Sequence, residues 1–477
     1  MKRSKKMIAL VAVLVIACIA TLALTQYEEK QEEIKNSDAI ILEIPTDTVQ
    51  SLSWEFAETG LAFHKGENGW LYEDDEAFPV SEEKINAILS NFEAFGVAFI
   101  IENVEDYSQY GLDEPEATIH LSTDDRSYDL KLGSFSKMDE QRYVDIGDGN
   151  VYLVSSDPMD YLQTALSSMI EHDDTPSFED VADITFSGSE NYTIVKTEGS
   201  PNTYSDEDVY FAQLNGEELP LDTDDITDYL NTITSLDLLN YVTYNATEEE
   251  LQSYGLDHPE LNVTVNYTYI DDDDETVSDV CVIHIGQNVE ELAAYEQAVE
   301  AEEALPDVTK YVRIGDSQIV YMLDDLDYST LTSASYDDLR HREVFWADFD
   351  TVTQIDITLE DENHSITSAL DEEDGERVWY FGEEEIDLVD LQNALEDLSA
   401  DRFTDEIPTE KEEIGLTVYL DNENFPQVKI QFYRYDGSNC LAVVDGETIS
   451  LVSRSSVMEL VEAVQSIVLN KEKANET

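Results

Sequence analysis

The residues of this chain that could carry out chemistry are mainly carboxylates, because Asp and Glu number 108 while there are seven histidines and three cysteines. Carboxylates act as acids, bases and oxygen ligands, and histidine acts as a base or a metal ligand. None of the histidines has the spacing to another that metal-binding motifs show. The sequence therefore predicts no metal site. The histidines are His64, His120, His172, His258, His284, His341 and His364.

No motif of a known catalytic mechanism accompanies these side chains. The chain contains no Gly-x-Ser-x-Gly turn, no His-Glu-x-x-His pair and no glycine-rich phosphate loop. Carboxylate pairs are so numerous that no single pair is informative. We therefore expect a protein that is not an enzyme and needs no cofactor. The remaining alternative is catalysis by carboxylates alone, which requires no recognisable motif.

The elements that position these residues are repeated, and a phrase of seven residues carries the repeat. It occurs as Tyr110-Gly-Leu-Asp-Glu-Pro-Glu116 and as Tyr254-Gly-Leu-Asp-His-Pro-Glu260, with six of seven residues identical. An alternating strand pattern follows each copy, over 117–121 and 261–265. Such an identity is not expected by chance, and it predicts internal repeats.

We interpret the phrase as a structural turn. Its glycine is expected to adopt a positive φ, and its proline forbids helix and favours an extended lead into the strand. Its tyrosine can bury the ring and hydrogen-bond through the hydroxyl, and its aspartate can cap the turn by accepting backbone N–H bonds. The alternative is a cation or ligand site in each unit. The turn residues are Tyr110, Gly111, Leu112, Asp113 and Pro115, and Tyr254, Gly255, Leu256, Asp257 and Pro259.

Further similarities extend the repeat on both sides of the phrase. Apolar residues at steps of three and four predict one helix upstream of each copy. Downstream, Tyr143-Val-Asp-Ile-Gly-Asp148 matches Tyr311-Val-Arg-Ile-Gly-Asp316. The second copy also carries an insertion near 288–307 that is rich in helix formers and should be helical. The helix stripes are Ile85, Ile88, Leu89, Phe92 and Phe95 after Ser81, and Ile226, Tyr229, Leu230, Ile233 and Leu236 after Asp222.

A third, degenerate copy completes the chain. It has a leucine stripe for the helix, and Glu413-Ile-Gly-Leu416 retains only part of the phrase. The alternating strands predict antiparallel sheets with one face covered by a helix, in the α+β class. The stripe consists of Leu388, Leu391, Leu395 and Leu398. The predicted parts are a basic start and anchor at 1–30, repeat unit 1 at 31–175, repeat unit 2 at 176–340 and repeat unit 3 at 341–477.

The first 30 residues have the organisation of a membrane anchor. Four basic residues within 2–6 precede the apolar run Met7–Leu24, which contains no charge. At 1.5 Å per residue such a helix is about 27 Å long, close to the roughly 30 Å of a hydrocarbon core. Basic residues stay in the cytoplasm, so the body should face outward. We therefore predict a single-pass transmembrane helix with a cytoplasmic N-terminus and an extracytoplasmic body.

Two alternatives remain for this segment. One is a cleaved signal peptide, although Thr25-Gln-Tyr27 lacks the small residues of a cleavage site. The other is a lipoprotein signal, because Val15-Ile-Ala-Cys18 resembles one and Cys18 would then be acylated. The residues after Cys18 are apolar and depart from that pattern. The other cysteines, Cys281 and Cys440, lie in predicted strands and form no disulfide framework.

The charge of the chain limits its partners. Lys and Arg number 25, so the formal net charge is -83. Phosphates would be repelled, which argues against a nucleic-acid partner, and the same charge opposes binding flat on anionic lipid. A partner with a basic surface would be attracted over long range.

The basic start, the membrane helix, the Tyr-Gly-Leu-Asp-x-Pro phrase and the segment Leu339-Arg-His-Arg-Glu-Val-Phe345 together resemble a bacterial family, the domain of unknown function 4340 (DUF4340). The resemblance covers most of the chain after the anchor. Family members are often encoded beside ATP-binding-cassette (ABC) permeases and the auxiliary proteins named for gliding motility. The resemblance implies an accessory or scaffold protein of an envelope transport system, with a permease or auxiliary subunit as partner, and no catalytic residues. The alternative is an independent ligand- or cell-wall-binding module.

Overall fold

The computed structural model describes residues 14–21 and 39–475, apart from residues 58, 103, 272, 361 and 371–376. Within the apolar run Met7–Leu24, residues 14–21 form a helix, and the rest of the run lies outside the described residues. No described helix is both long and apolar enough to cross a membrane. The transmembrane helix therefore stays a prediction.

The chain divides into two compact units, of which residues 1–173 with 243–245 form the first and residues 174–242 with 246–477 form the second. The first contains one nine-stranded sheet and the second contains two. The three sheets occupy successive stretches of the sequence, so the class is α+β with three sheet units, as predicted. The boundaries proposed for the repeat units are not tested by this division and stay predictions.

The spatial order of the strands differs from their sequence order in every sheet. From one edge to the other, the first sheet consists of β1 (Ala39–Leu42), β5 (Phe95–Ile101), β9 (Val151–Val154), β8 (Gln141–Asp145), β7 (Ser127–Ser136), β6 (Ala117–Thr123), β2 (Val49–Phe56), β3 (Thr59–Gly66) and β4 (Gly69–Tyr72). The second consists of β13 (Glu217–Pro220), β12 (Tyr210–Leu214), β11 (Tyr192–Lys196), β10 (Asp180–Gly188), β15 (Leu261–Ile270), β16 (Thr276–Gln287), β17 (Lys310–Ile314), β18 (Val320–Leu323) and β14 (Tyr241–Thr243). The third consists of β22 (Glu384–Ile386), β21 (Arg377–Phe381), β20 (Glu362–Leu370), β19 (Val352–Leu359), β24 (Glu412–Leu420), β25 (Gln427–Arg434), β26 (Asn439–Val444), β27 (Glu447–Ser453) and β23 (Ala400–Phe403).

Apart from β1, which precedes the opening run of the first sheet and pairs with β5 at the far edge, the three sheets share one connectivity. An opening run of three or four strands leads into a helix, and the strand after the helix lies at or next to the far edge of the sheet. A four-stranded meander then fills the space between. Its first strand pairs antiparallel with the opening strand, as β6 does with β2, β15 with β10 and β24 with β19. The repeat inferred from the sequence is therefore a repeat of topology.

Alternation along the strands places one face of each sheet in a core. In β15, Leu261, Val263 and Val265 are fully buried, and the residues between them are partly exposed. Successive side chains of a strand point to opposite faces, so this pattern marks the covered face. The same alternation that predicted antiparallel strands thus also determines which side chains meet the helices.

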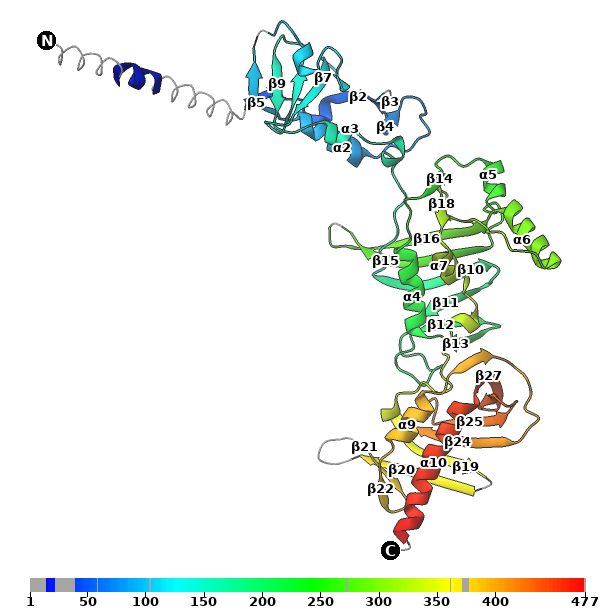
Figure 1. The fold of residues 1–477 in the computed structure, drawn as a ribbon. Helices are drawn as coiled ribbons and strands as arrows, with labels where there is room; N and C mark the ends of the chain where they lie inside the picture. Colours follow the sequence, from blue (N-terminus) through cyan, green and yellow to red (C-terminus); the bar gives the residue numbers. More distant parts are fainter. Residues whose placement is uncertain are drawn as a thin grey trace, which may run out of the picture. The chain divides into compact units, whose positions relative to one another are not determined.

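The predicted helices form and cover these faces. They are α2 (Glu82–Leu89), α4 (Thr223–Thr234) and α9 (Val389–Glu396), and a second helix packs against each of them. The second helices are α3 (Met159–Leu162), α7 (Asp325–Thr332) and α10 (Arg454–Asn475). Figure 1 shows α9 and α10 together on one face of the third sheet, where α10 contacts β26 and β27.

Of the three predicted helices, α4 has a side-chain cap, whereas α2 and α9 begin after Ser81 and Leu388 without one. Asp222 caps α4, because its carboxylate accepts the backbone N–H groups of Asp224 and Asp225 at 2.9 and 3.4 Å. The stripe of the first helix extends less far than predicted. The helix ends at Leu89, and Phe95 belongs to β5, where it pairs with Leu42 while staying buried.

The remaining helical elements are short, except for the one in the insertion of the second copy. There α6 is capped by Asn288, whose side chain accepts two backbone N–H bonds, and none of its residues is buried. The insertion is thus an exposed helix, as its composition predicted. The other elements are α5 (Glu248–Ser253), α6 (Val289–Ala301), α8 (Tyr336–Leu339) and the 3-10 turns Thr46–Thr48, Ser90–Phe92, Ser108–Tyr110, Leu166–Ser168 and Phe349–Thr351.

The two cysteines of the sheets lie in cores. Cys281 in β16 is 6% exposed, and Cys440 in β26 is fully buried. Burial raises the pKa of each thiol to about 11, with a nearby carboxylate (Asp279 for Cys281, Glu413 for Cys440) adding to the effect. Both thiols therefore stay protonated near neutral pH. Because only the thiolate is a nucleophile, both cysteines should be unreactive.

We expect iodoacetamide to label Cys281 and Cys440 at pH 8 at least about 100-fold more slowly in the folded chain than in urea, since roughly a thousandth of thiols with this pKa are ionised at that pH and the sulfur is buried. Peptide mass spectrometry of timed samples measures both rates. Equal rates in the two states would contradict the buried placement.

Candidate functional site

The repeated phrase ends a helical turn in each of the first two sheets. In the second copy, Leu256 N donates to Leu251 O at 2.8 Å and Gly255 N donates to Gln252 O at 3.2 Å. The first copy makes the same two bonds within 107–112. This pair of bonds is the Schellman motif, in which a residue of left-handed conformation stops the helix.

The glycines and leucines of the phrase have the conformation and burial that this motif requires. Gly111 and Gly255 have φ values of 68° and 67°, which confirms the predicted positive φ. Leu112 and Leu256 are buried, at 1% and 4% exposure. A buried residue after the glycine usually accompanies the motif, because it returns the chain to the core.

Each turn lies directly against a strand of the meander. A Cβ on Gly286 of β16 would lie 2.7 Å from Tyr254 O, and a Cβ on Gly133 of β7 would collide with Tyr110 O. Only glycine allows this approach of two backbones. The phrase therefore depends on a second glycine that sequence analysis did not connect with it.

The tyrosines of the phrase also meet the second repeated segment. The ring of Tyr110 lies 4.9 Å from that of Tyr143, and the ring of Tyr254 lies 4.5 Å from that of Tyr311. The two sequence matches, one just before the meander and one in its third strand, are thus in contact in both sheets. Their recurrence together is explained by packing.

The prolines of the phrase lie where they were predicted, whereas its aspartates do not make the predicted capping bonds. Pro115 and Pro259 lie just ahead of β6 and β15, as predicted. The carboxylates of Asp113 and Asp257 are exposed, and no hydrogen bond to either is found among the described residues. The predicted capping by aspartate is therefore not observed there, because the backbone closes the turn by itself.

The last residue of the phrase makes the polar contacts instead. Glu260 Oε2 accepts hydrogen bonds from Gln287 Nε2 and Tyr328 Oη, each at 2.7 Å. Glu116 Oε2 lies 2.8 Å from Nη1 of the buried Arg142. These contacts tie the end of the turn to the meander and, through Tyr328, to α7, and among the described residues they form no group of side chains that converges on a ligand.

The third sheet does not contain the turn. Gly415 lies inside β24, paired with Gln431 of β25, and Leu416 is a buried strand residue. The partial match Glu413–Leu416 is therefore part of a strand, and the resemblance of repeat unit 3 to the phrase ends there.

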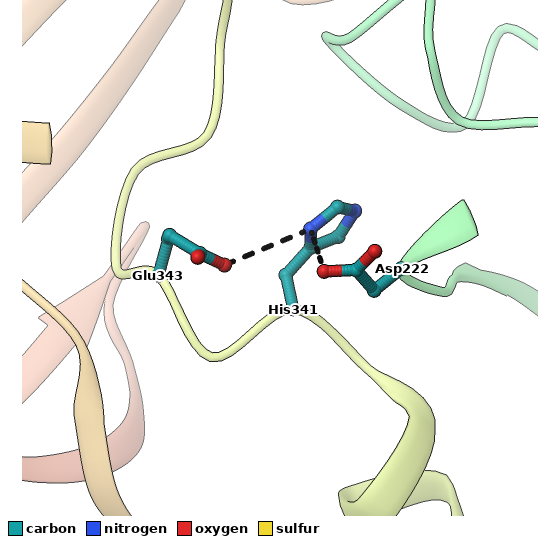
Figure 2. A group of neighbouring side chains, drawn as sticks. All are labelled: Asp222, His341 and Glu343. Carbon is teal, nitrogen blue, oxygen red and sulfur yellow. Dashed lines mark ion pairs between the residues drawn. The ribbon is translucent and has the colours of Figure 1, made fainter. Parts of the chain in front are cut away.

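A different constellation lies on the segment that leads into the third sheet (Figure 2). His341 Nδ1 is 3.5 Å from Asp222 Oδ2 and 4.0 Å from Glu343 Oε2. One ligand atom from each of the three residues lies within 4.8 Å of the other two. Figure 2 shows both carboxylates directed at the same ring nitrogen. The side chain of His341 is 12% exposed, that of Asp222 24% and that of Glu343 44%.

The other ring nitrogen of His341 is held by a buried carboxylate. His341 Nε2 lies 2.8 Å from Asp208 Oδ1, and the side chain of Asp208 is 2% exposed. Asp208 Oδ2 also accepts from Trp346 Nε1 at 3.1 Å and from Thr203 Oγ1. Since an ionised Asp208 accepts hydrogen bonds only, Nε2 of His341 is assigned a proton, and Nδ1 faces the two other carboxylates.

Stacking on an aromatic ring fixes the orientation of the histidine. The imidazole of His341 stacks on Trp346 with a centroid distance of 4.5 Å and an interplanar angle of 12°. Trp346 in turn lies 4.6 Å from Tyr204, which comes from the loop between β11 and β12 and is buried in the core of the third sheet. The orientation of the histidine is therefore set by packing as well as by hydrogen bonds.

The surroundings of this cluster are negative. Burial, followed by the charges of Asp222 and Asp228, raises the pKa of Asp225 above its ordinary value. Oε2 of Glu343 is buried and has no hydrogen-bond partner among the described residues. An imidazole nitrogen with two carboxylates can hold either a proton on that nitrogen or a divalent cation.

Sequence analysis missed this cluster because its members are remote in the chain. Asp222 was identified only as the start of a helix, and His341 only as an isolated histidine within the family segment. The one local signal is the His-x-Glu spacing of His341 and Glu343, which places two side chains on one side of an extended segment. That Asp222 completes the group follows only from the fold.

Comparison with protein families shows a match over most of the chain. The model of the family described as a domain of unknown function (DUF4340) matches residues 70–213 and 213–418, which is more than half of the chain. The chain belongs to this family. No curated protein and no solved structure matches it.

The two DUF4340 segments are out of phase with the sheets. Each contains one copy of the Tyr-Gly-Leu-Asp phrase, and they meet at residue 213, inside β12. Each segment thus runs from the end of one opening run, through a helix and a meander, into the next sheet. The DUF4340 match places Asp208 in the first segment, while Asp222 and His341 lie in the second.

The turn of this DUF4340 chain predicts a defined pattern of destabilisation. Gly255→Val should cost about 1–3 kcal/mol, since φ is positive and the added Cβ would lie 2.7 Å from Gln287 O. Gly216→Val, at a positive φ with open space around it, should cost less. Asp257→Ala should be nearly neutral. Urea unfolding followed by circular dichroism measures all three.

The same series decides between the turn and a ligand site. Calcium or magnesium should rescue none of the three variants. If Asp257→Ala kept its stability but lost a metal-dependent increase of it, the interpretation of the phrase as a turn would be wrong.

Proposed function

We propose that this DUF4340 chain is a membrane-anchored, extracytoplasmic accessory or scaffold protein that works with an ABC-type envelope transport system and has no catalytic activity of its own. The observation that carries the proposal is the order of its parts. Basic residues and an uncharged apolar run come first, and three acidic sheet units of one topology follow. The apolar run supports a cell-membrane location with the N-terminus in the cytoplasm.

The exposed elements support a role in binding other proteins. The helix α6 is an insertion with no buried residue, and it extends a unit that is otherwise built like its neighbours. Insertions on repeated units map to surface loops, and such loops commonly carry specificity. The association with permeases and gliding-type auxiliary proteins is implied by the gene neighbourhoods of the family that this chain resembles.

The contacts of the repeated Tyr-Gly-Leu-Asp phrase support a structural role for the repeats. In both sheets where it occurs, the recurring phrase ends a helical turn and packs against a strand of the meander. The second candidate function is an independent ligand- or cell-wall-binding module. Acylation at Cys18, in place of a membrane helix, would favour it.

The topology of the proposal predicts that a periplasmic-type reporter fused after Thr477 is active and that protease added to intact spheroplasts removes the body of the chain. Cys18→Ser should leave membrane association unchanged, because the apolar run is the anchor. Immunoblots of the spheroplasts and of membrane and soluble fractions measure the protease cleavage and the membrane association, and an enzyme assay measures the reporter. Protection from protease would reverse the orientation, and release of the Cys18→Ser variant from the membrane would establish lipidation.

The transport role predicts that genes for an ABC permease lie next to the gene for this chain and that the permease copurifies with the detergent-solubilised chain. If the contact is electrostatic, copurification should decrease as the salt concentration rises, since the chain carries a charge of -83. A gene neighbourhood without any transporter would favour the independent binding module.

A further inference from the structure

We propose that Asp222, His341 and Glu343 bind one divalent first-row transition cation of the zinc type, between the second and third sheets of the second compact unit. This inference is independent of the transport role. It concerns a site formed by the N-terminus of α4 and by the segment that follows α8, two parts of the chain that converge only in the folded unit.

The geometry of the three ligand atoms is close to that of a metal site. A tetrahedral cation with bonds of about 2.1 Å holds its ligand atoms about 3.4 Å apart. His341 Nδ1 and Asp222 Oδ2 are 3.5 Å apart, and His341 Nδ1 and Glu343 Oε2 are 4.0 Å apart. The third pair, Asp222 and Glu343, lies within 4.8 Å, so the carboxylates have to approach one another when a cation binds, and Glu343 is the most exposed of the three.

The support of the histidine is the arrangement found behind zinc ligands. A ligating imidazole usually donates its second N–H to a carboxylate, which fixes the tautomer and raises the basicity of the ligating nitrogen. Asp208 Oδ1 is the carboxylate oxygen that accepts this bond from His341 Nε2, at 2.8 Å, and the side chain of Asp208 is 2% exposed. Trp346 holds the plane of the ring.

Asp222 is also positioned before any cation binds. Its Oδ1 accepts the backbone N–H groups at the start of α4, which leaves Oδ2 directed at His341. One carboxylate thus serves both the helix and the site. Because the cap already restricts the rotation of this side chain, binding a cation costs little additional conformational entropy.

The local charge favours a cation at this point. His341 Nδ1 faces two carboxylates, and the buried Oε2 of Glu343 has no hydrogen-bond partner among the described residues. The neighbouring Arg340 and Arg342 donate elsewhere, to Ile449 O and Ala400 O. A set of one nitrogen and two oxygens suits zinc and its neighbours better than calcium, which prefers oxygen alone.

The test uses the full-length chain in detergent, freed of metal with EDTA and titrated with Zn²⁺ by calorimetry at physiological salt. We expect one site per chain that is distinct from weak binding to the acidic surface. His341→Gln, Asp222→Asn and Glu343→Gln should each weaken that site at least about tenfold, because each removes one ligand. Asp222→Asn keeps a good helix cap, so its effect reports the metal and not the helix.

His364→Ala is the matched control, because His364 is 15% exposed and lies 4.0 Å from Glu362, much as His341 lies by Glu343. It should bind zinc as the unaltered chain does. Equal binding by all variants, or loss of binding in His364→Ala alone, would overturn the proposal. Co²⁺ added to the unaltered chain provides a measurement that needs no variant. Visible bands of tetrahedral Co²⁺ are expected, and their absence would also overturn it.

Discussion

In the second compact unit, the carboxylate of Asp208 has to exchange water for protein donors, because only 2% of its side chain is exposed. Thr203, His341 and Trp346 provide these donors. Two of the three belong to the segment that leads into the third sheet. Satisfying one buried charge of the second sheet therefore fixes the path by which the third sheet begins.

The three sheets share a topology but stabilise it differently. In the first two, a left-handed glycine ends a helical turn, and this turn lies against a second glycine in the meander, Gly133 of β7 in the first sheet and Gly286 of β16 in the second. The third sheet has no such turn, since Gly415 is a strand residue. It receives Tyr204 from the second sheet into its core and is covered by the long helix α10. A loop of the second sheet thus completes the hydrophobic core of the third sheet.

Sequence reasoning predicted the features that local patterns determine. The positive φ of Gly255, the start of α4 after Asp222 and the helical insertion follow from residue types within a few positions. It erred with Asp257, because the residue type permits a cap but the backbone had already closed the turn. It missed the cluster around His341, since ligand sets formed by remote segments leave no spacing to recognise.

The shared topology has a consequence for how the chain assembles as it is made. The strand after each helix is synthesised before the strand beside which it lies, as β5 is before β9 and β23 before β27. A chain that emerges N-terminus first therefore exposes an unfinished sheet until the last strand of each meander appears. A chaperone that recognises unpaired strand edges would find such an edge three times during the synthesis of one molecule, once for each sheet.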